Sequence, residues 1–338
     1  MIRFRHGHQA ISLPPGELWA AEHLQAEVYR DTPAEELRSI VRDVAGGMPW
    51  REAVAQRYAS SNPWLHQIIT SPTRDLFFRQ HPPDPGARVI DVGAGWGQIA
   101  LPLARNCMVT ALEPTPERLA FIQAAAKQEG SAPRMHYVQA SLFDVTFDAS
   151  FDLACCVGVL EWVPKFQAGD PHELQIAFLR RLHALLVPGG RLVIGIENRL
   201  GLKYLLGAPD DHLAAPNISV YDARLADRKW QIQGGEALRV FTFTRTELTE
   251  MLSAAGLSDP RFFAALPDYK LPRQILPLGP EVDGFFRQGG YVVEHDGSCG
   301  EPLSCQAELR SHYLSLAQLG IASDFVPSFY VSCQRGGN

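Results

Sequence analysis

The sequence lacks the features that would place it in a membrane, outside the cell or on a nucleic acid. None of its stretches approaches the ~20 consecutive apolar residues that a helix needs to span a bilayer. Its N-terminus has no continuous apolar segment of the kind found in secretory signals. With a net charge of −6, the chain has no basic excess for binding nucleic acid or an anionic membrane. We therefore expect neither as a partner.

Cysteine is scarce, and its spacing excludes the common zinc motifs. The six cysteines include no C-x-x-C pair. Cys155 and Cys156 lie in an apolar run, where we expect reduced core residues. His6 and His8 have the spacing of two residues on one face of a strand, but no third ligand lies nearby. The sequence thus predicts no metal site and a cytoplasmic protein.

The stretch RVIDVGAGWG, residues 88–97, combines an apolar run with three glycines. Gly93, Gly95 and Gly97 come directly after the run, and QIALPLARN then has apolar residues at helical spacing. Strand, glycine turn and helix form the opening of a nucleotide-binding α/β sheet. Glycine is needed in such a turn because backbone N–H groups must approach the ligand more closely than a Cβ would allow. The helix N-terminus adds a partial positive charge.

Predicted strands and helices alternate from residue 88 onward. With 46% hydrophobic and 20% charged residues, the chain has the composition of a soluble globular protein. The alternation predicts an α/β fold with a doubly wound, mostly parallel, Rossmann-like sheet and right-handed crossovers. The expected strands are 88–91, 108–112, 135–139, 151–157, 191–196, 261–266 and 328–334.

The flanks of this alternation have a different pattern. Residues 1–80 have apolar residues at helical intervals, so we predict a helical extension ahead of a core at 81–338. Two long excursions of mixed composition, 197–240 and 268–324, interrupt the core. Because ligands of doubly wound sheets bind beyond the carboxyl ends of the strands, we expect these insertions on the substrate side.

The spacing of the glycines distinguishes between cofactor families. A dinucleotide-binding loop, G-x-G-x-x-G, would have its third glycine at position 98, which is Gln98 here. The pattern is instead D-x-G-x-G-x-G, which resembles motif I of the class I S-adenosylmethionine-dependent methyltransferases. The LEW turn after the fourth strand and the PGG turn before the fifth resemble further motifs of that family in the same order. The resemblance covers about a third of the chain.

The resemblance implies a seven-stranded sheet with S-adenosyl-L-methionine as cofactor and S-adenosyl-L-homocysteine as product. Glu113 ends the second strand, 16 residues after Gly97. It is expected to accept hydrogen bonds from two ribose hydroxyls, the alternative being a solvated acid. The family usually has an acid where this chain has Ser141, so Asp144 is an alternative adenine contact. The expected cofactor-binding residues are Asp91, Gly93, Gly95, Gly97, Glu113, Ser141, Leu142 and Gly158.

The flanking segments also resemble parts of this family. Extensions like residues 1–80 fold over the cofactor in some methyltransferases; a packing layer or a homodimer contact is the alternative. The segments 197–212, 266–272 and 326–331 look like methyltransferase domains from bacterial surface-glycan gene clusters. That narrower resemblance implies transfer to a saccharide or a related small polar acceptor, at oxygen.

Methyl transfer from a sulfonium is an in-line displacement, and a hydroxyl acceptor must lose a proton. His212 is the expected general base because the ordinary pKa of histidine lies near neutrality. Asp211 or Asp210 would orient it. The other reading of these three residues is a polar loop or a helix cap. Further candidates are Glu197, Tyr204 and Tyr269.

The sequence thus predicts a bacterial S-adenosylmethionine-dependent methyltransferase that acts on a small polar molecule. A nicotinamide-dependent oxidoreductase is the second hypothesis, which Gln98 and the PGG turn disfavour. The third hypothesis is a non-catalytic protein that binds the cofactor without using it.

Overall fold

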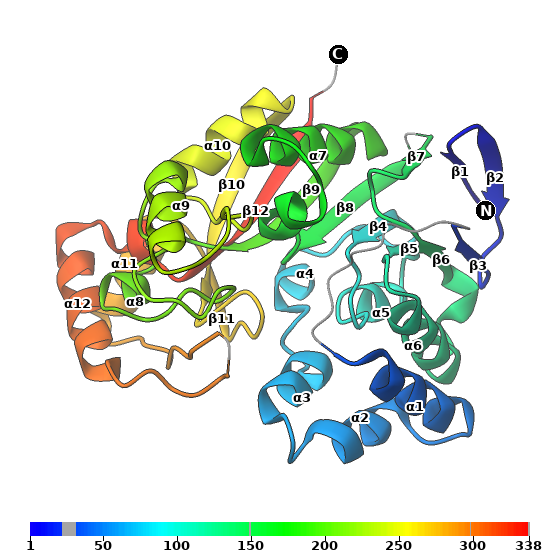
Figure 1. Ribbon diagram of the computed structural model, residues 1–338, viewed down its shortest axis with the longest axis horizontal. Coiled ribbons are helices and arrows are strands. Elements are labelled where there is room, and N and C mark those ends of the chain that lie inside the picture. The colour runs from blue at the N-terminus through cyan, green and yellow to red at the C-terminus, as the bar shows by residue number, and fades with distance from the viewer. Residues whose placement is uncertain (22–31, 149, 298, 337–338) are drawn as a thin grey trace. The chain divides into compact units, whose positions relative to one another are not determined.

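The computed structural model describes residues 1–21, 32–148, 150–297 and 299–336. The chain divides into two compact units (Figure 1). The first unit consists of Met1–Val157, Arg180–Val193 and Gln334–Asn338, and the second of Gly158–Leu179 and Ile194–Cys333. Helix α7 (Pro171–Leu185) and strand β9 (Leu186–Glu197) each contribute residues to both units.

Parallel strands form the centre of the first unit. β4 lies between β5 and β8, and its register pairs Val89 with Val109 on one side and with Leu153 on the other. Nearly all residues of these strands are buried, which suits parallel strands covered on both faces. The strands predicted from the sequence in this region are therefore confirmed. They are β4 (Arg88–Val92), β5 (Met108–Leu112), β6 (Met135–Gln139) and β8 (Phe151–Val157).

Hydrogen bonds join nine strands of the described residues in the order β11-β10-β12-β9-β8-β4-β5-β6-β3. The predicted α/β class with a large, mostly parallel sheet is confirmed. The number of strands exceeds the expected seven because β3 pairs parallel with β6, and β11 pairs antiparallel with β10. The additional strands are β3 (Leu18–Ala20) and β11 (Gln274–Pro277), whereas β10 (Leu257–Leu266) and β12 (Ser328–Arg335) were predicted from the sequence.

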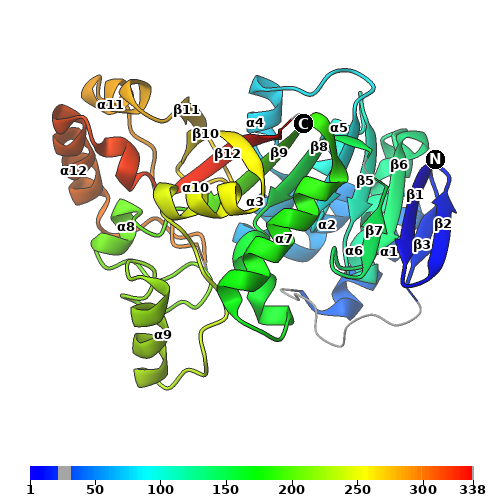
Figure 2. The same ribbon diagram turned by 90° about the horizontal axis from the view of Figure 1, so that it is seen from above.

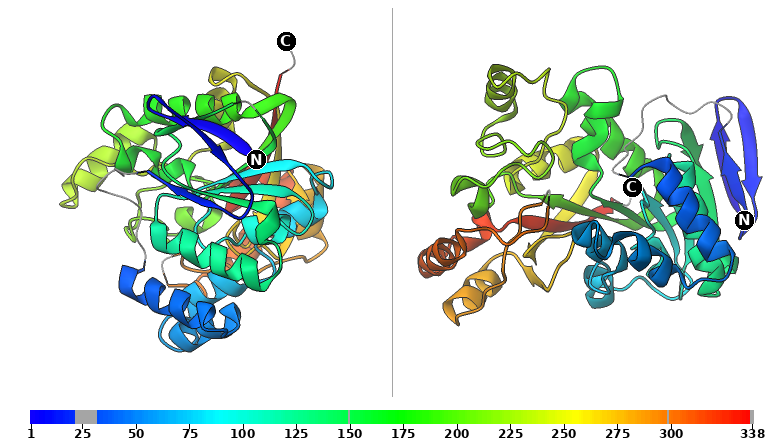
Figure 3. Two further views of the ribbon diagram at one scale, coloured as in Figure 1. Left: turned by 90° about the vertical axis from the view of Figure 1, so that its right-hand side faces the viewer. Right: turned by 60° about the horizontal axis from the view of Figure 1, so that its bottom comes forward.

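The N-terminus forms strands, which corrects the prediction that residues 1–80 are helical throughout. β1 (Ile2–His6) and β2 (Gln9–Leu13) form an antiparallel hairpin, and β1 also pairs with β7 (Val145–Phe147) (Figure 3). Phe4 of β1 is buried and packs edge-on against Trp19. Short apolar intervals suit either a strand or a helix, and pairing with a distant strand decided between them.

Four helices follow in the first unit, from residue 34 onward; residues 22–31 of the predicted extension lie outside the described part of the chain. α1 and α2 pack on α6 (Pro116–Gln128), where Arg38 pairs with Glu117 at 2.8 Å and Trp50 Nε1 donates to Glu129. α1 and α2 thus pack on this unit, and the predicted role of the extension as a cover for the cofactor stays a prediction. They are α1 (Ala34–Ala45), α2 (Trp50–Tyr58), α3 (Pro63–Thr70) and α4 (Leu76–Gln80).

Short helices and connecting turns make up most of the second unit (Figure 2). α11 and α12 pack side by side, with the rings of Phe286 and Tyr313 stacked at 4.4 Å. Among the described residues, none of the helices has both the length and the apolar character that crossing a membrane requires. The helices of this unit are α8 (Leu202–Leu205), α9 (Ala223–Ile232), α10 (Arg245–Ala254), α11 (Pro280–Arg287) and α12 (Gln306–Leu319).

Candidate functional site

The loop after β4 has the left-handed backbone that its glycines allow. Gly93, Gly95 and Gly97 have φ angles of 72°, 55° and 79°, which L side chains rarely adopt. A Cβ at Gly97 would lie 3.0 Å from Ile122 of α6, so this glycine lets the helix pack against the loop. A Cβ at Gly95 would make only ordinary contacts, the nearest at 3.7 Å from the Gln98 side chain. α5 (Ala100–Leu103) follows the loop.

Glu113 lies directly after β5, and its buried carboxylate supports the glycine loop. Oε2 accepts a hydrogen bond from the Gly95 N–H at 2.9 Å, and Oε1 accepts one from the Thr115 N–H at 3.0 Å. A carboxylate can accept about four hydrogen bonds, so acceptor capacity remains on both oxygens. The residue is therefore able to accept from two vicinal hydroxyls while it holds the loop.

Asp91 lies near the end of β4, just before the glycine loop, and its carboxyl group is buried. Its Oδ2 has no hydrogen-bond partner among the described residues. Burial raises the pKa of Asp91 to about 7, although the charge of Arg74 opposes this. A buried acceptor without a partner beside a glycine turn is a position suited to a polar ligand group.

Ser141 and Leu142 form a turn after β6. The Ser141 N–H donates to Asp144 Oδ2 at 3.2 Å, and Ser141 Oγ accepts from the Phe143 N–H at 3.3 Å. Leu142 is buried. The Asp144 carboxylate therefore lies within the same turn as Ser141, which keeps both residues available as candidates for a contact to a base.

Gly158 belongs to the second unit, and its surroundings explain why a glycine is needed at this position. Its φ is 73°, and a Cβ there would lie 2.9 Å from the hydroxyl of Tyr269. Its N–H donates to the Gly195 carbonyl at 2.9 Å. The glycine therefore allows the close approach of Tyr269, a contact that the sequence did not indicate.

A cluster of buried charges lies in the second unit beyond Glu197, the last residue of β9. Lys203 Nζ contacts the Asp211 carboxylate at 2.8 and 3.0 Å. Lys270 Nζ binds Glu197 Oε1 and lies 3.4 Å from Asp211. Although burial opposes it, the Asp211 carboxylate raises the pKa of Lys203. Both lysines are therefore ammonium ions that neutralise neighbouring carboxylates.

His212 lies between carboxylates in this cluster. Its Nδ1 is 3.6 Å from Asp210, and its Nε2 is 3.5 Å from Glu197 Oε2 and 3.7 Å from Glu161 Oε1. Burial lowers the pKa of His212, but these carboxylates outweigh burial and raise it well above its ordinary value. Such an imidazole carries a proton at neutral pH, so it differs from the neutral base expected from the sequence. Its carboxylate partner is Asp210, because Asp211 is held by Lys203 instead.

The tyrosines proposed as alternatives are also buried here. Burial raises the pKa of both Tyr204 and Tyr269 well above the ordinary value. The Tyr269 hydroxyl donates to Glu161 Oε1 at 3.4 Å. Both phenols are therefore neutral donors at physiological pH rather than bases.

Sequence reasoning did not select Glu161 as a site residue, although one signal for it was present. It follows the carboxyl end of the apolar strand β8, where ligands of such sheets bind. Nothing in the sequence indicated Lys203 and Lys270 as site residues, because only the tertiary structure brings them to Asp211.

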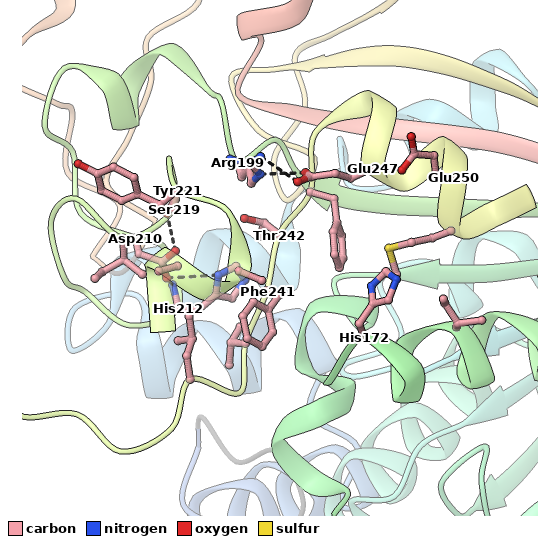
Figure 4. Close-up of a pocket in the computed structure, with 18 of the residues that line it drawn as sticks. His172, Arg199, Asp210, His212, Ser219, Tyr221, Phe241, Thr242, Glu247 and Glu250 are labelled. Carbon is pink, nitrogen blue, oxygen red and sulfur yellow. Dashed lines mark hydrogen bonds and ion pairs between the residues drawn. The ribbon is translucent and has the colours of Figure 1, made fainter. Parts of the chain in front are cut away.

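A cavity of about 280 Å³ lies in the second unit beside this cluster (Figure 4). Asp210 and His212 line it, together with aromatic rings and the ion pair of Arg199 with Glu247. Most of its wall comes from residues 197–240 and from the first residues of the following segment. Its polar and aromatic residues are His172, Arg199, Asp210, His212, Ser219, Tyr221, Phe241, Thr242, Phe243, Glu247 and Glu250.

The fold and the glycine loop define the class of protein, and a family comparison agrees with them. Residues 90–194 match the model of the family described as "Methyltransferase domain". Over these residues the chain therefore carries a methyltransferase domain, as its motifs predict. The narrower resemblance to the surface-glycan type stays a prediction.

Known relatives are similar over the same region. A "Ubiquinone biosynthesis O-methyltransferase" of Xanthomonas campestris pv. campestris (strain B100) is 34% identical over 125 residues, 36% of this chain and 48% of the relative. A relative of the same name from Rickettsia conorii is 30% identical over 120 residues, 35% of this chain and 38% of the relative. The chain thus spans about half, or less, of the length of the relatives it matches.

The solved structures that the chain resembles include a phosphoethanolamine N-methyltransferase 2 of Haemonchus contortus in complex with S-adenosyl-L-methionine. The TM-score is 0.45 and the sequence identity 14%, over 88% of this chain and 60% of that one.

Proposed function

We propose that the protein is an S-adenosylmethionine-dependent methyltransferase that transfers a methyl group to a small polar acceptor. The observation that carries the proposal is the methyltransferase domain at 90–194, with its left-handed glycine loop and buried acids. The second hypothesis, a nicotinamide-dependent oxidoreductase, has no comparable support.

The residues of the first unit fit the cofactor. The left-handed backbone at Gly95 and the unpartnered Oδ2 of Asp91 suit its methionine part, and the remaining acceptor capacity of Glu113 suits the ribose hydroxyls. Ser141, Leu142 and Asp144 would contact the adenine. When bound, S-adenosylmethionine supplies an electrophilic methyl group on a sulfonium.

The cavity of the second unit is the proposed acceptor site. Its aromatic rings suit a ring-shaped molecule, and its hydroxyl, imidazole and carboxylate groups suit hydroxyl substituents. A saccharide or glycosylated metabolite has both properties. The names of the relatives from Xanthomonas and Rickettsia, both O-methyltransferases, favour oxygen as the acceptor atom.

His212 and Glu197 are the proposed residues on the acceptor side, with Asp210 as the partner of His212. The proposal is supported by their position: Asp210 and His212 line the cavity, and Glu197 Oε2 lies 3.5 Å from His212 Nε2. Asp211 takes a supporting role in place of a catalytic one, since two lysines hold it.

Calorimetry with S-adenosylhomocysteine tests the cofactor half of the proposal. We expect micromolar binding to the full chain and none for NADPH. Gly95→Val should abolish binding, whereas Gly130→Val, at another glycine with positive φ and free space, should not. Equal binding of both variants, or NADPH binding alone, would contradict the proposal.

Transfer from S-adenosylmethionine labelled in its methyl group tests the catalytic half. We expect a product one CH2 heavier in a panel of saccharide acceptors and extracts. His212→Gln should lower kcat while the affinity for S-adenosylhomocysteine is unchanged. Cofactor binding without any labelled product would favour the third hypothesis, a protein that binds the cofactor without catalysis.

A further inference from the structure

The buried cluster of the second unit contains more carboxylates than ammonium groups. Five acids lie close together with two lysines, all largely buried. Buried carboxylates are costly unless a cation or a proton neutralises them. The acids of the cluster are Glu161, Glu197, Asp210, Asp211 and Asp268.

Three ligand-type atoms of this cluster, one each from Glu161, Glu197 and His212, are buried without a hydrogen-bond partner among the described residues. They are Oε2 of Glu161, Oε2 of Glu197 and Nε2 of His212. The side chains offer one ligand atom each within 4.8 Å of one another. Buried polar atoms of this kind normally have partners, so their convergence indicates a ligand between them.

We propose that Glu161, Glu197 and His212 bind a divalent transition-metal ion. Ligands bound at roughly 2.0–2.2 Å lie about 3.0–3.5 Å apart around a metal. His212 Nε2 lies 3.5 Å from Glu197 and 3.7 Å from Glu161, so only small side-chain shifts are needed. One imidazole with two carboxylates suits Mn²⁺, Fe²⁺ or Zn²⁺ better than Mg²⁺.

Asp210 prepares His212 for this role. It faces Nδ1 at 3.6 Å and leaves Nε2 toward the two glutamates. Binding of the ion at Nε2 releases the proton that His212 carries there without metal. The backbone N–H groups of His212 and Leu213 and the hydroxyl of Ser219 hold the Asp210 carboxylate, at 2.8, 2.9 and 2.5 Å. A carboxylate behind a metal-binding histidine fixes the ring and its tautomer in many metal sites.

A second group of acids, Glu197, Asp211 and Asp268, is a less suitable site. Lys270 Nζ already contacts all three, and Lys203 binds Asp211. Lys270 occupies Oε1 of Glu197, so Oε2 remains for the proposed ion. The cavity reaches His212 and Asp210 and gives an ion a path from solvent.

Metal titration of the full chain tests the site without using the methyltransferase activity. After dialysis against EDTA, loss of the free Mn²⁺ signal in electron paramagnetic resonance should show one bound equivalent per chain. Electron spin echo spectra should show coupling to one imidazole nitrogen. Calorimetry should give tighter binding for Zn²⁺ than for Mg²⁺.

Three variants locate the ion. Glu161→Gln and His212→Gln should weaken Mn²⁺ binding at least tenfold, and Asp210→Asn by 10- to 100-fold, the usual range for such partners. His172→Gln, a histidine on the same cavity wall outside the cluster, should bind Mn²⁺ like the wild type. S-adenosylhomocysteine binding reports folding and separates this test from that of the proposed function.

Two results would overturn the site. One is that wild-type chain takes up less than a tenth of an equivalent of Mn²⁺ and of Zn²⁺. The other is an electron spin echo spectrum of the wild-type chain with Mn²⁺ that shows no nitrogen coupling. This measurement does not depend on the folding of any variant. Binding that is unchanged in both Glu161→Gln and His212→Gln would likewise place any ion elsewhere.

Discussion

Individual glycines of the loop after β4 serve different purposes. A Cβ at Gly95 would make only ordinary contacts, the nearest at 3.7 Å, whereas a Cβ at Gly97 would lie 3.2 and 3.0 Å from Leu101 and Ile122. We therefore expect the first to serve ligand binding, whereas the second allows α6 to pack against the loop. Substitutions at the two positions should separate these roles.

Replacing Gly97 with alanine should destabilise the protein more than replacing Gly86. Both glycines have positive φ, so both variants carry backbone strain of about 1 kcal/mol. Only Gly97 would bring a Cβ against α6, which adds about 1–3 kcal/mol of overpacking. Urea unfolding of the two variants measures the difference. Equal losses would show that α6 adjusts without cost.

Asp91→Asn should change how stability depends on pH. Burial raises the pKa of Asp91 to about 7, above the value of about 4 in an unfolded chain. The folded state therefore binds more protons between these values, so this group costs stability as pH rises from about 4 to 7. The loss amounts to on the order of 4 kcal/mol.

The amide of Asp91→Asn resembles the protonated acid and does not titrate. Without ligand, the free energy of unfolding of the variant relative to wild type should therefore increase over this pH range and be constant above it. Urea unfolding at several pH values measures it. Parallel curves for the two proteins would mean that Asp91 is ionised throughout.

At the scale of elements, α10 begins with a capping box, in which the side chains of Thr244 and Glu247 each accept a hydrogen bond from the backbone N–H of the other. The Glu247 carboxylate accepts from the Thr244 N–H at 2.8 Å and forms two contacts of 2.8 Å with Arg199, which lies shortly after β9. The pair joins the helix to a segment far away in the sequence. It also lines the proposed acceptor cavity.

Glu247→Ala should lower the free energy of unfolding by about 1–3 kcal/mol, through loss of the cap and of the partner of Arg199. Glu250→Ala, on the same helix but exposed, should change it by less than about 0.5 kcal/mol. Thermal and urea unfolding measure both. Similar losses would indicate that α10 is stabilised only by its apolar face.

The strands also show where a local sequence pattern is enough to predict an element. The strands β5, β6 and β8 have the predicted bounds, because continuous apolar runs between turn residues have few other solutions. β1 and β3 were missed because they pair with β7 and β6, which lie far along the chain. β2 was missed with them because it pairs with β1.

At the scale of the molecule, ligand binding should stabilise the folded chain. S-adenosylhomocysteine at 100 times its dissociation constant should add about 2.7 kcal/mol to the free energy of unfolding. In Glu113→Gln the amide replaces one acceptor of the carboxylate with a donor, so the gain at the same concentration should be smaller. Thermal unfolding with and without ligand measures both, and NADPH serves as the control.

An equal gain in wild type and Glu113→Gln would mean that Glu113 supports the loop without contacting the ligand. No gain for wild type would contradict cofactor binding itself.

The sequence by itself determined the α/β class, the methyltransferase motif and the positions of Asp91, Glu113 and the loop glycines. These depend on short-range requirements, namely strand periodicity and backbone angles that only glycine adopts easily. The tertiary structure alone decided that His212 meets Glu161 and Glu197, that lysines hold Asp211, and that β3 and β11 extend the sheet. Contacts between distant segments, and the burial that shifts the pKa values there, leave no periodic trace in the sequence.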